Sequence, residues 1–166
     1  YFGFVVGGTL PAALAGDILT STIDQNGGIW SLSPAAAQTE LVVARWLKEL
    51  FGLPMSWRGV MTSGATMSNL VGLAAARQWA SERLGFDAAE DGLGGHPPIP
   101  VISSEAIHAS ARKALGNLGF GRSSVRTVPA SDGRVDVAAL EREMASIDGP
   151  VIVIGNGGEV NTGQFD

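Results

Sequence analysis

The spacing of apolar positions along the chain predicts two long helices in its first half. Apolar residues recur at helical spacing after Ser33-Pro34 and again from about Met67 to Leu84. Each stretch stops at a glycine, Gly52 in the first case and Gly85 in the second. Serine is suited to cap a helix, and proline to fill its first position. We therefore expect one helix from Pro34 to Gly52 and another over residues 67–84.

Short apolar runs alternate with further helical patterns in the remaining sequence. The predicted strands are residues 57–61, 99–103, 124–128 and 151–154, and the predicted helices are residues 109–118 and 137–147. A turn is expected at Ser131-Asp132-Gly133. Strands that alternate with helices imply right-handed crossovers, so we expect an α/β fold with a largely parallel sheet.

Composition limits the partners of this chain. Its 166 residues are 45% hydrophobic, enough for the core of one ordinary domain or for part of a larger one. The net charge is −5 and the eleven basic residues are scattered, which predicts neither nucleic acid nor a membrane surface as a partner. With no cysteine there is neither a disulfide nor a thiolate metal site. We expect a cytoplasmic protein that binds small molecules or protein, without a metal.

The two ends of the sequence suggest a fragment. The apolar start, residues 1–19, lacks a basic leader and is interrupted by glycines, Pro11 and Asp17, so it resembles neither a signal peptide nor a membrane span. The chain has no initiator methionine and stops at Gln164-Phe165-Asp166 without a terminal helix.

A run of small residues, Thr62 to Leu70, leads directly into the second predicted helix. Small residues let backbone N–H groups approach an anion, and the helix directs its positive end to the same place. The run is neither a Walker loop nor a dinucleotide fingerprint, because the required lysine and later glycines are absent. The alternative is that the small residues only let the helix pack closely against a strand.

Two further segments follow predicted strands, where open α/β sheets bind ligands. His108 can stack on or protonate a bound group, or it can simply cap a helix in solvent. The glycine-rich segment 155–163 can wrap a ligand or form an ordinary turn. His96, between Gly95 and Pro97, is expected to be exposed and without function.

Taken together, these segments resemble the group II pyridoxal-phosphate-dependent amino acid decarboxylases, the relatives of the aromatic amino acid, tyrosine and glutamate decarboxylases. The matching segments occur in the family's order over nearly the whole chain: Tyr1-Phe2-Gly3, Trp30-Ser31-Leu32-Ser33-Pro34-Ala35 with Thr39-Glu40, Thr62-Ser63-Gly64-Ala65-Thr66 with Asn69-Leu70, and His108-Ala109-Ser110 with Lys113-Ala114.

The resemblance implies part of the large domain of the fold type I pyridoxal-phosphate-dependent transferases. Residues 1–33 would form an entrance segment and substrate-side loop, and residues 34–166 a partial cofactor-binding domain. Gly64, Ala65 and Thr66 would hold the phosphate of pyridoxal phosphate, and His108 would stack over its ring and act in catalysis. The implied reaction is decarboxylation of an L-amino acid to an amine and CO2, in a homodimer.

The resemblance also implies that residues essential to the chemistry are missing. Neither Lys48 nor Lys113 matches the family's Schiff-base lysine, which lies downstream of the position matching Asp166, as does the aspartate that binds the pyridine nitrogen. This chain alone is therefore expected to be inactive. In place of the family's Gly-Thr-Thr stands Gly158-Glu159-Val160, which lacks a hydroxyl often found near the ring.

Two alternatives stay open at this point. The first is another enzyme of the same fold, such as an aminotransferase, a carbon–carbon lyase or a desulfurase, which the downstream active-site sequence would distinguish. The second is a non-catalytic α/β module that binds a ligand or a protein, for which the missing lysine is the best argument.

Overall fold

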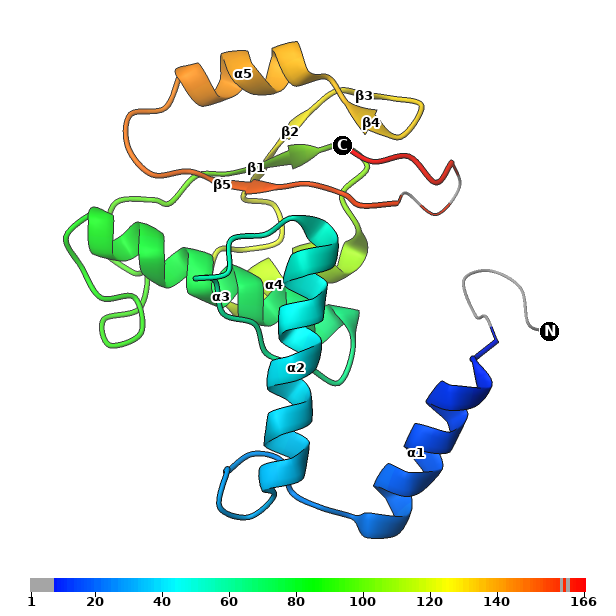
Figure 1. Ribbon diagram of the computed structural model, residues 1–166. Coiled ribbons are helices and arrows are strands. Elements are labelled where there is room, and N and C mark those ends of the chain that lie inside the picture. Colours follow the sequence, from blue (N-terminus) through cyan, green and yellow to red (C-terminus); the bar gives the residue numbers. More distant parts are fainter. Residues whose placement is uncertain (1–7, 159, 161) are drawn as a thin grey trace. The chain divides into compact units, whose positions relative to one another are not determined.

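The chain forms two compact units, residues up to Met61 and residues from Thr62 onward, in the computed structural model shown in Figure 1. The structure describes residues 8–158, 160 and 162–166. The Tyr1-Phe2-Gly3 motif and Glu159 lie outside the described residues. The functional boundary expected between residues 33 and 34 falls within the first unit.

The first unit contains helices α1 (Pro11–Ile23) and α2 (Pro34–Phe51). Helix α2 confirms the prediction, since Pro34 is its first residue and Gly52 ends it with a left-handed φ of 63°. Helix α1 was not predicted, because Pro11 looked like an interruption although it starts the helix. Among the described residues, no helix is both long and apolar enough to cross a membrane.

The strand predicted over residues 57–61 is wrong, because this segment is irregular. The ammonium group of Lys48 donates hydrogen bonds to the carbonyls of Met55 and Trp57, at 3.0 Å each. The carboxylate of Glu40 accepts another from the N–H of Met61 at 2.6 Å. Two side chains of α2 thus bind backbone groups that a strand would pair with a neighbouring strand.

The second unit follows the predicted alternation of helices and strands. Its elements are α3 (Ala65–Arg83), β1 (Val101–Ser104), α4 (Ala109–Asn117), β2 (Val125–Val128), β3 (Ala130–Ser131), β4 (Arg134–Val135), α5 (Val137–Ala145) and β5 (Ile152–Ile154). The predicted turn joins the antiparallel strands β3 and β4, with left-handed backbone at Asp132 and Gly133.

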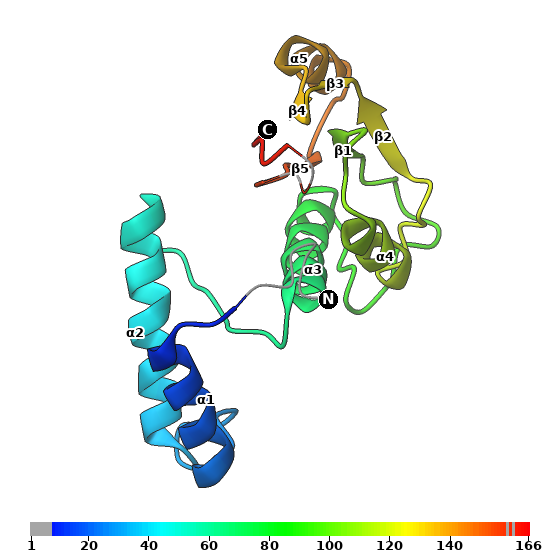
Figure 2. The same cartoon turned by 90° about the vertical axis from the view of Figure 1, so that its right-hand side faces the viewer.

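A parallel sheet in the order β2-β1-β5 forms the centre of the second unit. Figures 1 and 2 show α5 on one face of this sheet and α3 and α4 on the other. Successive residues of β1 supply both faces: Val101 packs into the core beneath α3 and α4, and Ile102 packs with Val128 and Ala139 beneath α5. The expected α/β class, with a parallel sheet flanked by helices, is confirmed.

Candidate functional site

The small-residue run includes the first turn of α3, where backbone N–H groups are free to bind an anion. Gly64 immediately precedes the helix, and no described side chain caps it. Among the described residues, none accepts a hydrogen bond from the N–H of Ala65 or Thr66. A Cβ placed on Gly64 would meet nothing within 4 Å, so the space in front of the helix is open. This geometry fits a phosphate group.

Two hydroxyls shape the turn in front of this helix. The Thr62 hydroxyl donates to the carbonyl of Gly64 at 3.2 Å and lies 2.7 Å from the hydroxyl of Ser68. Because residues 57–61 form no strand, the turn joins a loop to a helix instead of a strand to a helix. Helix α3 nevertheless packs against the sheet, because Leu70 at the end of the run lies against the core that holds Val101 and Ile152. The close packing and the open helix start are therefore both present.

His108 lies four residues beyond the last strand residue of β1 and is the N-cap of α4. Its Nδ1 atom accepts a hydrogen bond from the N–H of Ser110 at 3.2 Å. Ile107, which precedes it, is buried and its N–H donates to the carbonyl of Ser104. The capping role considered from the sequence is therefore present, and the exposed imidazole ring is also free to contact a ligand.

One hydrogen bond joins the starts of α3 and α4. The side-chain amide of Asn69 donates to the Ser110 hydroxyl at 2.8 Å, and that hydroxyl lies 2.7 Å from Nδ1 of His108. Asn69 lies near the end of the small-residue run, about one helical turn into α3. The small-residue turn and His108 thus lie at neighbouring helix N-termini.

The Asp166 carboxylate hydrogen-bonds to several segments at the same end of the sheet. Asp166 accepts hydrogen bonds from the N–H groups of Val135 and Asn156, at 2.8 Å each, and from the hydroxyl of Ser104 at 3.4 Å. The side-chain amide of Asn156 also donates to Ser104 at 3.0 Å. The end of β1, the residues after β5 and strand β4 therefore share one polar cluster.

The glycine-rich segment after β5 closes on itself in its described part. Gly157 pairs with Phe165 in an antiparallel bridge, and the N–H of Gly158 donates to the carbonyl of Gln164. This arrangement matches the ordinary turn that was the alternative to a ligand-wrapping loop.

The structure also describes the three other candidate residues of the sequence, His96, Lys48 and Lys113. The expectation that His96 is exposed is wrong, since it is half-buried and stacks on Phe86 with ring centroids 4.1 Å apart. Its apolar environment was not visible from its neighbours Gly95 and Pro97. Lys48 binds backbone carbonyls in the first unit, and Lys113 is exposed on α4.

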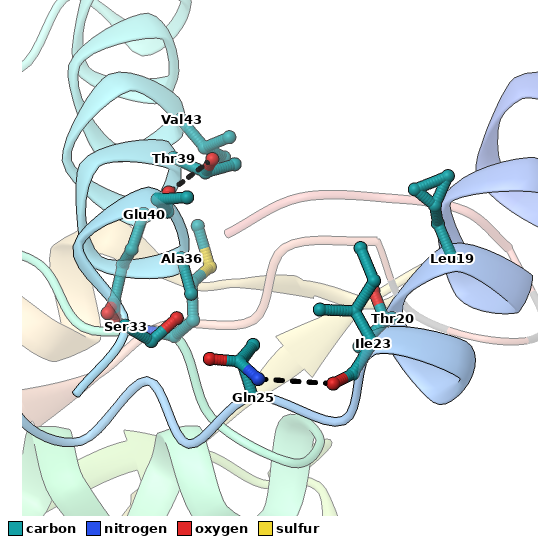
Figure 3. Close-up of a pocket in the computed structure, with 11 residues that line it drawn as sticks. Leu19, Thr20, Ile23, Gln25, Ser33, Ala36, Thr39, Glu40 and Val43 are labelled. Carbon is teal, nitrogen blue, oxygen red and sulfur yellow. Dashed lines mark hydrogen bonds between the residues drawn. The ribbon is translucent and has the colours of Figure 1, made fainter.

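The first unit contains a separate pocket of about 580 Å³ between α1 and α2, which the sequence did not predict. Figure 3 shows Leu19 and Ile23 of α1 on one side and Ala36, Glu40 and Val43 of α2 on the other. Most of the lining is apolar. Among the described residues of the apolar run 1–19, only Leu19 lines the pocket, so that run did not indicate it.

The parallel sheet, the open helix start and the adjacent histidine define an α/β protein with two neighbouring helix starts, one of which has a geometry that fits a phosphate group. The pyridoxal-dependent decarboxylase conserved domain matches residues 2–166, and the chain belongs to this family. It is 31% identical over 171 residues to L-2,4-diaminobutyrate decarboxylase of Acinetobacter baumannii, covering 95% of this chain and 34% of that protein. Human cysteine sulfinic acid decarboxylase is also 31% identical, over 100% of this chain and 34% of its own length.

Solved structures agree with this family assignment. The glutamate decarboxylase domain of a Vibrio parahaemolyticus protein superposes with a TM-score of 0.84 at 28% identity, covering 95% of this chain and 36% of that one. The rice tryptophan decarboxylase solved with pyridoxal phosphate and tryptamine gives 0.77 at 28% identity, covering 95% and 34%. The fold is that of the fold type I enzymes, as expected, and the chain spans about a third of the length of its relatives.

Proposed function

We propose that the complete protein containing this chain is a pyridoxal-phosphate-dependent decarboxylase that converts an L-amino acid to an amine and CO2. The observation that carries the proposal is the hydrogen bond from Asn69 to Ser110, which holds the open start of α3 beside the start of α4. Family membership and the relatives' activities support the same reaction.

The residues of this chain fit the cofactor's phosphate and ring. The N–H groups of Ala65 and Thr66 would bind the phosphate, and Gly64 leaves room for it. Bound pyridoxal phosphate supplies an electron-withdrawing ring that accepts the electron pair left when a carboxylate departs as CO2. His108 would pack its imidazole against that ring, orient the substrate carboxylate and hold a proton near the reacting carbon.

The proposal also assigns separate roles to the two parts of the chain. Residues 1–33 would form an entrance segment and substrate-side loop, and residues 34–166 the first part of the cofactor-binding large domain. We propose a cytoplasmic homodimer, consistent with the absence of cysteine and with the apolar side chains that α1 leaves exposed, among them Leu14 and Ile18.

The test is the His108→Ala variant of the complete protein. Removing the imidazole should lower turnover by at least about 100-fold, the usual contribution of a positioned acid or base, while retention of pyridoxal phosphate changes little. His96→Gln is the matched control, because these are the chain's two histidines and His96 stacks on Phe86 instead.

Product analysis separates the alternatives. Release of CO2 with formation of an amine is expected, whereas a keto acid would indicate an aminotransferase. Unchanged turnover in His108→Ala would remove His108 from the mechanism. Failure of the complete protein to bind pyridoxal phosphate would overturn the proposed function itself.

A further inference from the structure

The imidazole ring of His108 is held by two donors on a single edge. The backbone N–H of Ser110 lies 3.2 Å from Nδ1, and the Ser110 hydroxyl lies 2.7 Å from the same atom. A backbone N–H can only donate, so Nδ1 must be the nitrogen without a proton. In a neutral imidazole the proton is then on Nε2, which bonds to none of the described residues.

Asn69 orients the Ser110 hydroxyl. Its amide N–H donates to the Ser110 oxygen at 2.8 Å, so the hydroxyl hydrogen is left to point at Nδ1 of His108. Ser110 is only 9% exposed, so its hydroxyl is largely shielded from water. The three groups form a directed chain of donors that runs from α3 through α4 to the ring.

We propose that Asn69 and Ser110 are positioning residues that fix His108 in its Nε2-protonated tautomer and prevent the ring from turning over. A proton on Nδ1 would face the N–H of Ser110, placing two donors against each other. The ring would therefore present an N–H group on the edge that faces away from α4. The catalytic value of this arrangement rests on the proposed function, whereas the tautomer itself does not.

The tautomer can be measured without cofactor or substrate. The complete protein is prepared with histidine labelled by ¹⁵N in the ring, and magic-angle-spinning NMR is recorded at about pH 9, above the usual titration range of histidine. The difference between the parent spectrum and that of His108→Gln isolates the His108 signals. One unprotonated Nδ1 and one protonated Nε2 are expected, and a mixed or reversed pattern in the parent would overturn the proposal.

Three variants test the chain of donors. Ser110→Ala removes the closer donor and should lower the Nε2-protonated to Nδ1-protonated ratio about fivefold, the change that corresponds to one net hydrogen bond. Asn69→Asp replaces the amide donor with an acceptor of similar shape, so the Ser110 hydroxyl should donate to residue 69 instead of to His108. The ratio should then fall at least fivefold as well. Ser110→Thr retains the hydroxyl and should restore the parent ratio.

The control and the kinetic readout distinguish positioning from general structural damage. Asn117→Ala, an exposed asparagine at the end of α4, should leave the ratio unchanged. If the proposed decarboxylase activity is present, Ser110→Ala should lower kcat with little change in KM, and Ser110→Thr should recover it. An unchanged tautomer ratio in folded Ser110→Ala and Asn69→Asp would refute the positioning role. Failure to decarboxylate, with the ratios as expected, would instead refute the proposed function.

Discussion

Replacing Ala65 with proline removes one backbone N–H from the proposed phosphate site and little else. Ala65 is the first residue of α3, and no described residue accepts a hydrogen bond from its N–H. Proline is well tolerated at this position, because its fixed φ suits the first turn and that N–H has no partner within the helix. The preceding Gly64 is extended, with a φ of 161° and a ψ of 171°, and so lies outside the α region that a following proline disfavours.

The size of the effect follows from the charge on the acceptor. A hydrogen bond to a charged group contributes about 1.5–3 kcal/mol, so losing one should raise the Kd for pyridoxal phosphate about 10- to 150-fold. The free energy of unfolding of the apo protein should change by no more than about 0.5 kcal/mol. Weaker cofactor binding in an equally stable protein is therefore the expected result for Ala65→Pro.

The assay is titration of the complete apo protein with pyridoxal phosphate, followed by visible absorbance. Val137→Pro is the matched control, since Val137 is the first residue of α5, is 58% exposed and lies outside the proposed site. Its Kd should equal that of the parent. If folded Ala65→Pro binds the cofactor within twofold of the parent, the N–H of Ala65 does not bind the phosphate.

Two further predictions concern the fold and a surface carboxylate. Ile102→Ala should lower the free energy of unfolding by about 2–5 kcal/mol in urea denaturation, because Ile102 is 0% exposed beneath α5, whereas exposed Val137→Ala should change it little. The hydrogen bond from the Gln78 side chain, with a further one from the N–H of Ala89, lowers the pKa of Asp87 below its ordinary 3.8. Its stabilising contribution is therefore present above about pH 4 and lost as pH falls through the lowered value. Gln78→Leu should raise this pKa in an NMR titration, and an unchanged value would refute the assigned cause.

Local sequence signals predicted most of the elements because their causes are local. Pro34 starts α2 because its ring fixes φ at a helical value, and Gly52 ends it because glycine adopts a left-handed φ. Both are properties of single residues. Residues 57–61 carried the composition of a strand, but a strand needs a neighbour, and here Lys48 binds the carbonyls instead. The competing partner was not visible in the short apolar run itself.

The candidate site was predictable as separate segments but not as an arrangement. The small-residue run and His108 could each be identified from residue type and from position before a helix. The hydrogen bond that joins their helices connects Asn69 and Ser110, 41 residues apart, and its geometry depends on how α3 and α4 pack. Whether these residues bind pyridoxal phosphate stays a prediction.

The Asp166 carboxylate has a consequence for the order of folding. It binds Ser104, 62 residues earlier, and the backbone of Val135, 31 residues earlier. During synthesis the segments of β1, β4 and β5 leave the ribosome before Asp166 does, so the parallel strands can pair before this carboxylate is available. Bringing Asp166 to Ser104 closes a large loop, which costs chain entropy. Strand pairs that form earlier have already paid most of this cost, because they hold the ends of the loop near each other. The end of the sheet near His108 would thus be completed late, on a scaffold that is already ordered.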